Sequence, residues 1–415
     1  MHVSCCIVGG GPAGMMLGLL LARAGVDVLV LEKHADFLRD FRGDTIHPST
    51  LELMYELGVL DEFLARPHQE LKQLAGQFGN ELIPFADFSH LPTQCKFIAF
   101  MPQWHFLNFL ADLGRRYPTF QLWMDAEVVD LIETNGRITG AKVETKEGST
   151  DVTSDLLIGA DGRTSLVRER AGLKVQELGA PIDVMWFRIS RLPHDSSQGL
   201  GRFAGGRIMV MLNRGDYWQC GYLIAKGTLD QVKQRGIEAF RQDMLTVAPF
   251  LRDRANEIRD WDGIRLLTVR VDRLLKWYRP GLLCIGDAAH AMSPVGGIGI
   301  NVAIQDAVAA ANILAEPLKN KTLTEDDLEK VQRRRLFPTR VTQAAQVFMQ
   351  NRVLKPILGN TQQISAPFVL RLFQWFPFLR RIPARLVGIG VRPEHIKTVD
   401  AFKGEEVKRA RGKKD

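Results

Sequence analysis

Residues 9–14, Gly-Gly-Gly-Pro-Ala-Gly, have the composition and spacing of a segment that binds phosphate. Gly9 permits a tight turn, Gly11 lets a pyrophosphate approach the backbone, and Gly14 lets a helix pack closely against its strand. Pro12 suits the first turn of a helix, where the amides have no partner within the helix. Because these amides and the positive end of the helix dipole attract anions, the segment predicts a phosphate-binding helix N-terminus.

The elements that must position this segment can also be predicted. The apolar run 3–8 is typical of a buried strand, and 15–24 is typical of a helix. A second apolar strand, 26–31, leads to Glu32, which stands 18 residues after the last motif glycine. A carboxylate there can bind a ribose diol and would repel a ribose 2′-phosphate. A lone glycine motif also occurs in ordinary tight turns, but the complete arrangement favours FAD or NAD over NADP, with Lys33 beside the acid.

A second glycine-rich segment stands much later in the chain. Asp287 follows a third buried strand, 282–285, at the carboxyl end where α/β sheets bind ligands. An aspartate there can accept hydrogen bonds from a polyhydroxyl chain such as ribityl. The loop 294–299 then leads to Asn301, which is expected to open an alanine-rich helix that ends near residue 315. Such a helix end, aimed at a flavin ring, would favour the reduced anionic ring by ~0.3–1 kcal/mol, or ~2 kcal/mol if partly buried.

A third motif, Gly-Ala-Asp-Gly-x-x-Ser-x-Val-Arg at 159–168, completes a pattern that resembles the FAD-dependent aromatic hydroxylases. These are single-component flavin monooxygenases of the para-hydroxybenzoate hydroxylase type. The resemblance covers about 340 residues. It implies an α/β fold in which a Rossmann-type FAD-binding domain is interleaved with an antiparallel-sheet substrate domain and followed by C-terminal helices.

The resemblance also implies roles for single residues. It links the 159–168 motif to FAD and nicotinamide handling, places Asp287 on the ribityl chain, and places the loop from Pro294 beside the isoalloxazine ring. Arg42 and Gln103 match FAD-phosphate contacts more loosely, with a solvated loop cation and a polar helix-start residue as the alternatives. The predicted cofactor site comprises Gly9, Gly11, Pro12, Ala13, Gly14, Glu32, Lys33, Arg42, Gln103, Val128, Asp161, Asp287, Pro294, Gly299, Ile300 and Asn301.

Two further residues stand near the predicted ring. Ile298 departs from the family pattern, which more often has glutamine between the two loop glycines, so one polar contact is expected to be absent and backbone amides to take its place. His290 follows the Gly-Asp motif and could be catalytic, but a hydrogen-bonded structural histidine is favoured. No catalytic residue is assigned, and no spacing of metal ligands is found in the sequence.

The chain of 415 residues exceeds the size of one hydrophobic core, so two interleaved domains are expected. A hairpin turn is predicted at 213–216, and a helical stretch at 229–247 is predicted to cover the outer side of its sheet. The expected divisions are an FAD-binding domain of 1–73, 101–180 and 271–345, a substrate domain of 74–100 and 181–270, and a C-terminal helical segment with a basic tail at 346–415.

Aromatic side chains of the predicted hairpin, with those of 74–100, suggest an apolar or aromatic substrate. Tyr217, Trp218 and Tyr222 are equally compatible with lining a cavity and with packing, because strand side chains alternate between two faces. Arg188, Tyr217 and Tyr222 are candidates for the polarity of the pocket.

Composition is that of a globular protein, with 46% hydrophobic and 24% charged residues and a net charge of +7. Five cysteines without a Cys-x-x-Cys pair are typical of reduced core thiols, and the absence of a charged leader before the first strand favours a cytoplasmic protein. Except for a basic cluster at 408–414, for which a solvated tail is favoured, the basic residues are dispersed, which argues against nucleic acid as a partner. The apolar, arginine-punctuated segment beyond residue 351 could contact a membrane surface, but helices packed on the core are favoured.

Together these features predict an FAD-dependent monooxygenase that hydroxylates an aromatic or other apolar small molecule. In the family's reaction, NAD(P)H reduces bound FAD, dioxygen adds to the ring, and a flavin hydroperoxide transfers one oxygen to the substrate. The first alternative is an FAD-dependent dehydrogenase or prenyl-chain reductase on the same scaffold. The second is a flavoprotein that binds FAD and a membrane or partner without turnover.

Overall fold

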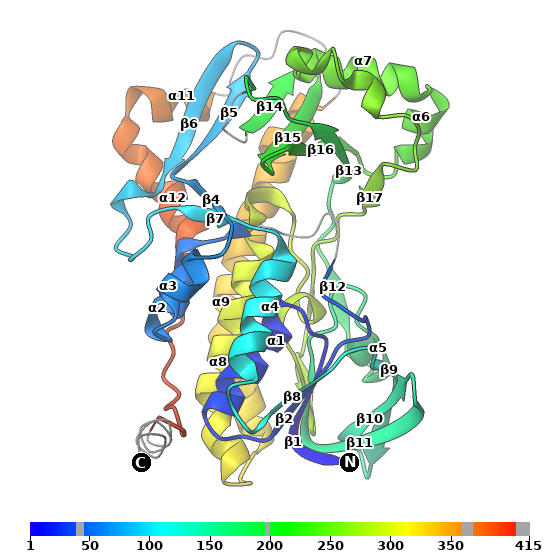
Figure 1. The fold of residues 1–415 in the computed structure, drawn as a ribbon, viewed down its shortest axis with the longest axis vertical. Helices are drawn as coiled ribbons and strands as arrows, with labels where there is room; N and C mark the ends of the chain where they lie inside the picture. The colour runs from blue at the N-terminus through cyan, green and yellow to red at the C-terminus, as the bar shows by residue number, and fades with distance from the viewer. Residues whose placement is uncertain (39–44, 196–199, 359–367, 404–415) are drawn as a thin grey trace, which may run out of the picture.

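The computed structural model describes residues 1–38, 45–195, 200–358 and 368–403. An eight-stranded sheet lies at one end of the molecule and a seven-stranded sheet at the other, and the helices α8 (Gly299–Lys319) and α9 (Glu325–Met349) extend along its length (Figure 1). The predicted α/β domain with a separate, largely antiparallel sheet is confirmed.

The central strands of the eight-stranded sheet are parallel, in the order β20, β11, β1, β2, β8. Their carboxyl ends therefore meet at one edge, where the glycine segment, the 159–168 motif and Asp287 follow them. An antiparallel edge strand and a meander complete the sheet. The strands are β1 (His2–Val8), β2 (Val28–Leu31), β8 (Phe120–Trp123), β9 (Glu127–Thr134), β10 (Arg137–Thr145), β11 (Gly148–Gly159), β19 (Tyr278–Arg279) and β20 (Leu282–Cys284).

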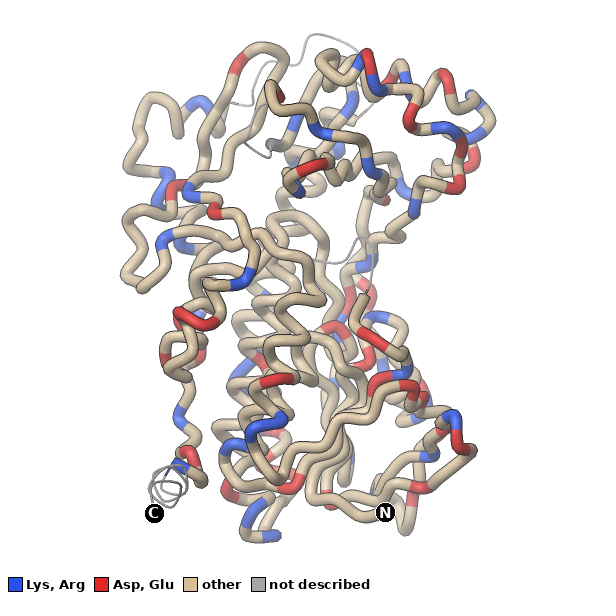
Figure 2. The backbone as a smooth tube through the Cα atoms, in the orientation of Figure 1, with Lys and Arg blue, Asp and Glu red and all other residues tan. Residues whose placement is uncertain are grey.

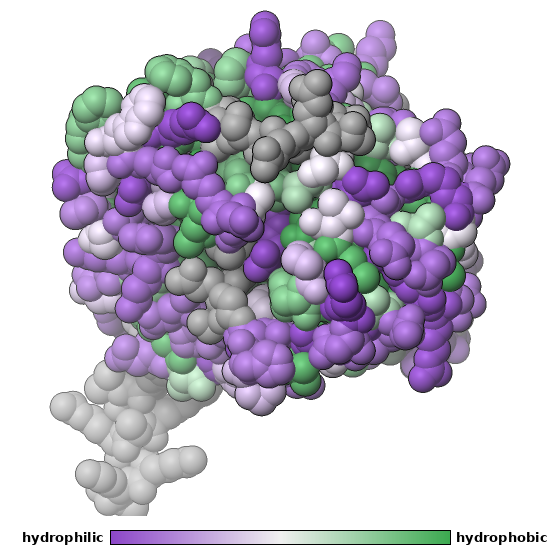
Figure 3. All heavy atoms as spheres, turned by 90° about the horizontal axis from the view of Figure 1, so that it is seen from above, coloured by the Kyte–Doolittle hydropathy of each residue, from purple (hydrophilic) through white to green (hydrophobic). Residues whose placement is uncertain are grey.

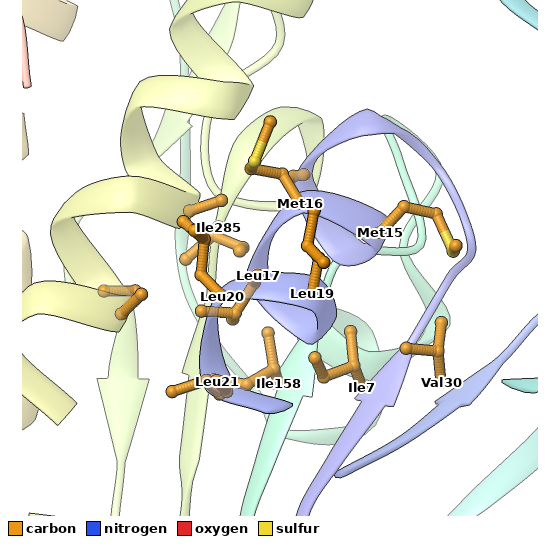
Figure 4. Close-up of a cluster of buried hydrophobic side chains, with 14 of the residues drawn as sticks. Ile7, Met15, Met16, Leu17, Leu19, Leu20, Leu21, Val30, Ile158 and Ile285 are labelled. Carbon is orange, nitrogen blue, oxygen red and sulfur yellow. The ribbon is translucent and has the colours of Figure 1, made fainter. Parts of the chain in front are cut away.

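The helix α1 (Pro12–Arg23) lies on this sheet, between α8 and α4 (Gln103–Gly114). Its apolar side chains are buried around the helix because the sheet covers one side and the two helices cover others. Figure 4 shows Leu19 and Leu20 of α1 above Ile7 and Ile158 of the sheet, with Ile285 near the α8 side. This packing fixes the N-terminus of α1 at the carboxyl edge of the strands.

Short elements connect the two sheets. They are a three-stranded sheet, three short helices and a two-stranded ribbon. These elements are β3 (Thr45–Ile46), α2 (Pro48–Glu56), α3 (Leu60–Leu64), β4 (Gln69–Leu71), β7 (Ile98–Phe100), α5 (Leu166–Arg170), β12 (Val175–Glu177) and β18 (Asp272–Leu274).

The second sheet has the order β17, β13, β16, β15, β14, β5, β6, with only the β14–β5 pair parallel. The predicted hairpin is present, because β15 and β16 pair antiparallel across the turn at 214–216. The helical stretch 229–247 is split into α6 (Leu229–Gln234) and α7 (Ile237–Val247), which cover one face. The strands are β5 (Gln73–Phe78), β6 (Glu81–Asp87), β13 (Ile182–Ser190), β14 (Leu200–Ala204), β15 (Arg207–Asn213), β16 (Tyr217–Ala225) and β17 (Arg265–Leu267).

Within the described residues, the last helix of the C-terminal part ends at residue 388. After α9 come the π-helical turn Gln350–Leu354, α10 (Lys355–Ile357), α11 (Phe368–Trp375), the 3-10 turn Pro377–Arg380 and α12 (Arg381–Gly388). An extended segment then returns along the first domain, where Ala401 N donates to Arg23 O at 2.9 Å. This extended segment was not predicted, because its backbone is held by side chains distant in sequence, such as Asn312 and Glu56.

The cysteines and a long apolar helix are buried in the protein. All five cysteines are buried and free of disulfides. In the part of the chain that the structure describes, one helical stretch, 295–319, is long and apolar enough to cross a membrane, and 72% of its most apolar window is buried inside the protein. This stretch contains α8, so its apolar character is accounted for by core packing.

Candidate active site

The glycine segment forms a turn in which each glycine meets a different constraint. Gly9 has a φ of +108°, and a Cβ there would lie 2.4 Å from the Ala160 carbonyl oxygen. A Cβ on Gly14 would lie 2.0 Å from the Gly9 carbonyl oxygen. At Gly11, by contrast, a Cβ would meet nothing within 4 Å. Gly9 and Gly14 are therefore required by the protein itself, whereas Gly11 faces open space.

The N-terminus of α1 is suited to an anion. Gly11 is the N-cap and supplies no side-chain acceptor, the first turn contains no acidic residue, and Pro12 occupies the first helical position. The amides of this turn, with Ala13 buried behind them, are thus left for a ligand.

Glu32 lies at the end of β2, beside the glycine turn. Its carboxylate accepts from Gly10 N at 3.0 Å and from His34 N at 3.1 Å, which fixes its position. Lys33 is exposed, and Val128 is buried in β9. The end of β2 and the start of β9 are joined here because Ala126 N donates to Glu32 O at 2.9 Å.

Asp161, at the end of β11, holds the turn that begins α5. Its carboxylate accepts from Ser165 Oγ at 2.5 Å and from Val167 N at 3.1 Å. Burial raises the pKa of Asp161, against the effect of these hydrogen bonds. Both carboxylate oxygens of Asp161 thus accept hydrogen bonds from the turn that begins α5.

Arg163 and Asp287 join the ends of β11 and β20. Arg163 Nη2 lies 3.2 Å from Asp287 Oδ2, and both side chains are about one-quarter exposed. Arg163 Nε and Nη1 are buried and have no hydrogen-bond acceptor among the described residues. Arg168 holds the backbone on both sides of this pair, since it donates to Arg163 O at 2.6 Å and to Ala288 O at 3.4 Å.

The loop before α8 is held against β3. Gly296 and Gly297 have φ values of +79° and +63°, and Thr45 Oγ1 donates to Gly297 O at 2.9 Å. The helix begins at Gly299, two residues earlier than predicted, and continues to Lys319 rather than ending near residue 315. It is longer because Ala315 and Leu318 are still packed in the core.

Asn301 therefore lies inside the first turn of α8. Its Oδ1 accepts from His47 N at 3.0 Å and from Thr50 Oγ1 at 2.7 Å, and its Nδ2 donates to Thr45 O at 3.2 Å. The Asn301 side chain is thus occupied by protein contacts. With Gly299 and Ile300, it can offer a ligand its backbone amide at the helix N-terminus.

A buried charge network lies behind this helix end. His290 Nε2 lies 2.5 Å from Asp306 Oδ2, and Arg335 Nε donates to Asp306 Oδ1 at 2.9 Å. Although burial alone would raise the pKa of Asp306, the neighbouring His290 and Arg335 lower it. Gly286 N also donates to Asp306, at 3.1 Å. His290 is thus a hydrogen-bonded buried residue that anchors the turn carrying Asp287.

Of the two residues that matched FAD-phosphate contacts loosely, Gln103 and Arg42, the structure describes Gln103. Gln103 is the first residue of α4 and is partly buried. Arg42 lies outside the described residues.

These residues fit FAD. The open N-terminus of α1 can receive a pyrophosphate, Glu32 can receive a ribose, and Asp287 with Arg163 stands at the next strand ends. A family model described as an FAD binding domain matches residues 2–345. The chain belongs to the FAD-dependent aromatic hydroxylases.

Curated relatives support the family, and a solved structure supports the fold. The chain is 31% identical over 387 residues to 6-methylpretetramide 4-monooxygenase of Streptomyces rimosus, covering 93% of this chain and 92% of the relative. It is 26% identical over 348 residues to para-nitrophenol 4-monooxygenase of Pseudomonas sp. (strain WBC-3), covering 80% and 82%. The structure of P. aeruginosa PqsL in complex with 2-aminobenzoylacetate matches with a TM-score of 0.73 at 20% identity, covering 88% of this chain and 98% of that one, and supports the fold. This hydroxylase-family chain is an FAD-dependent monooxygenase.

The second sheet presents one face toward the α8 loop. Val184, Ile208 and Leu223 belong to an apolar cluster to which Val295 of the loop also packs. Tyr222 is on the opposite face, where its ring lies 5.3 Å from that of Phe240, so it does not contribute polarity to the loop-facing side. Trp218 is likewise buried on the helix-covered face.

Arg188 and Tyr217 lie on the loop-facing side of the sheet, with the Arg188 guanidinium 5.0 Å from the centre of the Tyr217 ring. Trp186 shares this side. A Cβ on Gly221 would lie 3.0 Å from the Trp186 ring, so the absence of a side chain at Gly221 leaves room for the indole to lie over β16. The Trp186 Nε1 is buried without an acceptor among the described residues.

Arg163, Arg168 and the Thr45–Thr50 contacts were not predicted as parts of the site. Arg163 occupies a variable position of the 159–168 motif, and therefore carried no signal. Arg168 is the last residue of that motif, but its buried partner Asp272, at 3.4 Å, lies 104 residues further along the chain. Thr45 and Thr50 contact Asn301 across more than 250 residues, which no local pattern reveals.

Proposed function

We propose that this FAD-dependent monooxygenase hydroxylates an aromatic or other apolar small molecule, with NADPH or NADH as the transient reductant. The observation that carries this proposal is the packing of an apolar sheet face, with Val184 and Leu223, against the loop that leads into α8. A ring bound between such a face and the flavin would be shielded from water. Two curated relatives are named for 6-methylpretetramide and para-nitrophenol, and these names support the substrate class.

FAD, when bound, accepts hydride equivalents from the nicotinamide and activates dioxygen for transfer of one oxygen atom. The protein residues bind and orient it. The amides after Gly11 are assigned to the pyrophosphate, Glu32 to the ribose diol and Asp287 to the ribityl hydroxyls. The amides of Gly299 and Ile300 are assigned to the ring edge, where the helix dipole favours negative charge.

The substrate side contributes orientation and exclusion of water. We assign the unpaired Nε1–H of Trp186 to a polar group of the substrate, because a buried donor without an acceptor is costly unless a ligand supplies one. Arg188 and Tyr217 contribute polarity at the end of the same face. A Trp186→Phe variant should raise KM for a substrate with such a group more than it lowers kcat.

The proposed function is tested by aerobic turnover of the FAD-loaded protein with NADPH or NADH. The substrates would be phenols, quinolones and polycyclic aromatics, with para-nitrophenol and 6-methylpretetramide included because relatives are named for them. A product heavier by one oxygen atom, labelled when ¹⁸O₂ is supplied, is the expected result. A product that has only lost or gained two hydrogens would contradict hydroxylation and would support the dehydrogenase or reductase alternative.

We also propose a cytoplasmic location. The five thiols are buried and unpaired, as is usual in a reducing compartment, and the named relatives are enzymes of small-molecule oxidation. Fractionation of expressing cells would test it, because recovery in a secreted fraction would contradict the proposal.

A further inference from the structure

The C-terminal helices form a limb beside the edge strand β6. One side of this limb is part of the core. Ala384 is fully buried there, and a Cβ on Gly388 would lie 2.7 Å from Leu91 Cδ1. The limb is therefore a firmly packed part of the protein, in agreement with the favoured prediction.

The other side of the limb exposes large apolar side chains. The rings of Phe368 and Trp375 lie 5.9 Å apart, and those of Phe376 and Phe378 lie 6.1 Å apart, so the aromatics contact one another at the surface. Figure 3 looks down on this end of the molecule and shows hydrophobic residues gathered at its upper left, on the side where Figure 1 places α11. The exposed fractions are Phe368 66%, Trp375 58%, Phe376 47%, Phe378 62% and Ile382 66%. We name these five residues the aromatic patch.

The charged side chains of the limb itself, from residue 368 to residue 390, have one sign. Residues 368–390 contain four arginines and no aspartate or glutamate. Arg381 and Arg385 are exposed on α12, and Arg380 is held in place by a 2.8 Å bond from its Nε to Phe373 O. Figure 2 shows blue segments along this limb at the upper left. Arginine beside exposed aromatic rings is the composition of surfaces that lie at the headgroup level of a bilayer.

We propose that the aromatic patch and its arginines dock this enzyme on an anionic lipid surface. The positive charge of the arginines favours an anionic lipid surface over a second copy of the chain. A second copy of the chain, paired through the same patch about a two-fold axis, would set arginines against arginines. An anionic bilayer instead offers both phosphate groups for the arginines and an apolar layer for the rings. The proposal goes beyond the monooxygenase reaction and does not depend on the identity of its substrate.

The test is co-sedimentation of the full-length FAD-loaded protein with vesicles of phosphatidylcholine alone or mixed with phosphatidylglycerol. We expect binding to the anionic vesicles that weakens as salt is added. Arg381→Gln combined with Arg385→Gln should reduce the partition coefficient about 25-fold, at about fivefold for each arginine near an anionic surface. Trp375→Ser combined with Phe378→Ser should also reduce binding, and in this variant the remaining binding should be more sensitive to salt.

Matched controls separate the patch from general charge. Arg115→Gln combined with Arg170→Gln removes the same charge from exposed positions of the FAD-binding domain and should leave vesicle binding unchanged. Flavin content equal to that of the unmodified protein shows that each variant is folded. Absence of binding to anionic vesicles, or equal losses in the patch and control variants, would overturn the proposal. A second result would also overturn it: the unmodified protein is a dimer in sedimentation equilibrium, binds no vesicles, and becomes a monomer when Trp375→Ser and Phe378→Ser are combined.

Discussion

Arg163 and Asp287 form an ion pair, 3.2 Å apart, between the ends of two parallel strands, and the two residues are 124 positions apart in sequence. The pair uses one nitrogen of the guanidinium, and the other two are buried without an acceptor among the described residues. Arg163 can therefore give hydrogen bonds to FAD while Asp287 balances its charge.

Arg163→Gln should weaken FAD binding about 10- to 100-fold, because charge-assisted hydrogen bonds are worth ~1.5–3 kcal/mol each. Asp287→Ala should also lower flavin occupancy, since the ribityl acceptor is lost and Arg163 is left unpaired. Titration of the flavin-free protein, followed by quenching of FAD fluorescence, measures both effects. Arg170→Gln, an exposed arginine of α5, is the control and should bind FAD normally. Full flavin content in both site variants would remove the pair from the cofactor site.

We expect alanine to have opposite effects on stability at Gly11 and at Gly14. At Gly11, φ is −74° and no atom lies within 4 Å of the position that an added methyl group would take, so alanine fits the flavin-free protein and meets only the pyrophosphate. Gly11→Ala should keep or slightly raise stability, by up to ~1 kcal/mol, and should lower FAD affinity at least about tenfold.

Gly14→Ala should instead destabilise the protein without FAD, by ~1–3 kcal/mol or more, since its methyl would lie 2.0 Å from the Gly9 carbonyl oxygen. Urea unfolding of the flavin-free forms, with FAD titration in parallel, separates the two effects. If Gly11→Ala bound FAD as tightly as the unmodified chain, the pyrophosphate would have to lie elsewhere.

The strand, glycine turn and helix at residues 3–24 were predictable from sequence because the hydrophobic period and the glycines are local signals. The hydrogen bonds of the Asp161 carboxylate to Ser165 and Val167 were not predicted, because a motif match does not distinguish such a short-range arrangement from ligand binding, and the assignment of Asp161 to the cofactor stays a prediction. Asn301 was expected to open the helix, and its assignment to the cofactor stays a prediction; the contacts of its side chain with Thr45, His47 and Thr50 were not predicted, because they join segments distant in sequence.

The second sheet illustrates the limit set by tertiary packing. Alternation along a strand separates Tyr217 from Tyr222, but no pattern in the sequence states which face α7 covers. Helix α7 covers the face of Tyr222, and Arg188 with Tyr217 lies on the other. Choosing between the faces needs contacts such as that of Phe240 with Tyr222, which only the folded chain brings together.

Asp306 is expected to be a major contributor to stability. It is fully buried, and its carboxylate accepts hydrogen bonds from His290, Arg335 and the Gly286 amide. Asp306→Asn should cost about 3–5 kcal/mol, because it leaves the Arg335 charge buried with less compensation. Asp326→Asn on the exposed start of α9 removes a carboxylate that also pairs with cations and should change stability by less than ~0.5 kcal/mol. Urea unfolding of the two variants measures the difference, and equal midpoints would contradict a stabilising network.

His47 gives the protein a defined sensitivity to acid. The side chain is fully buried, and its Nδ1 lies 2.7 Å from the Val387 carbonyl oxygen, to which it donates in the neutral ring. Burial lowers the pKa of His47 to about 4, from an ordinary value of 6.5. Since the folded-state pKa is the lower one, the unfolded chain binds more protons between these values. The contribution of His47 to stability is therefore complete above pH ~6.5 and is lost as the pH falls toward 4.

The loss should reach up to ~3 kcal/mol at pH 4 from this residue, at about 1.36 kcal/mol for each pH unit between the two pKa values. His47→Asn retains a donor for Val387 and cannot take up a proton, so its urea midpoint should change less between pH 7 and 4.5 than that of the unmodified protein. His2→Asn, at an exposed position, should leave the profile unchanged. Because the His47 amide donates to Asn301 at the start of α8, FAD release on acidification should follow the same pH range. Parallel pH profiles for the His47→Asn variant and the unmodified chain would show that another group controls acid unfolding.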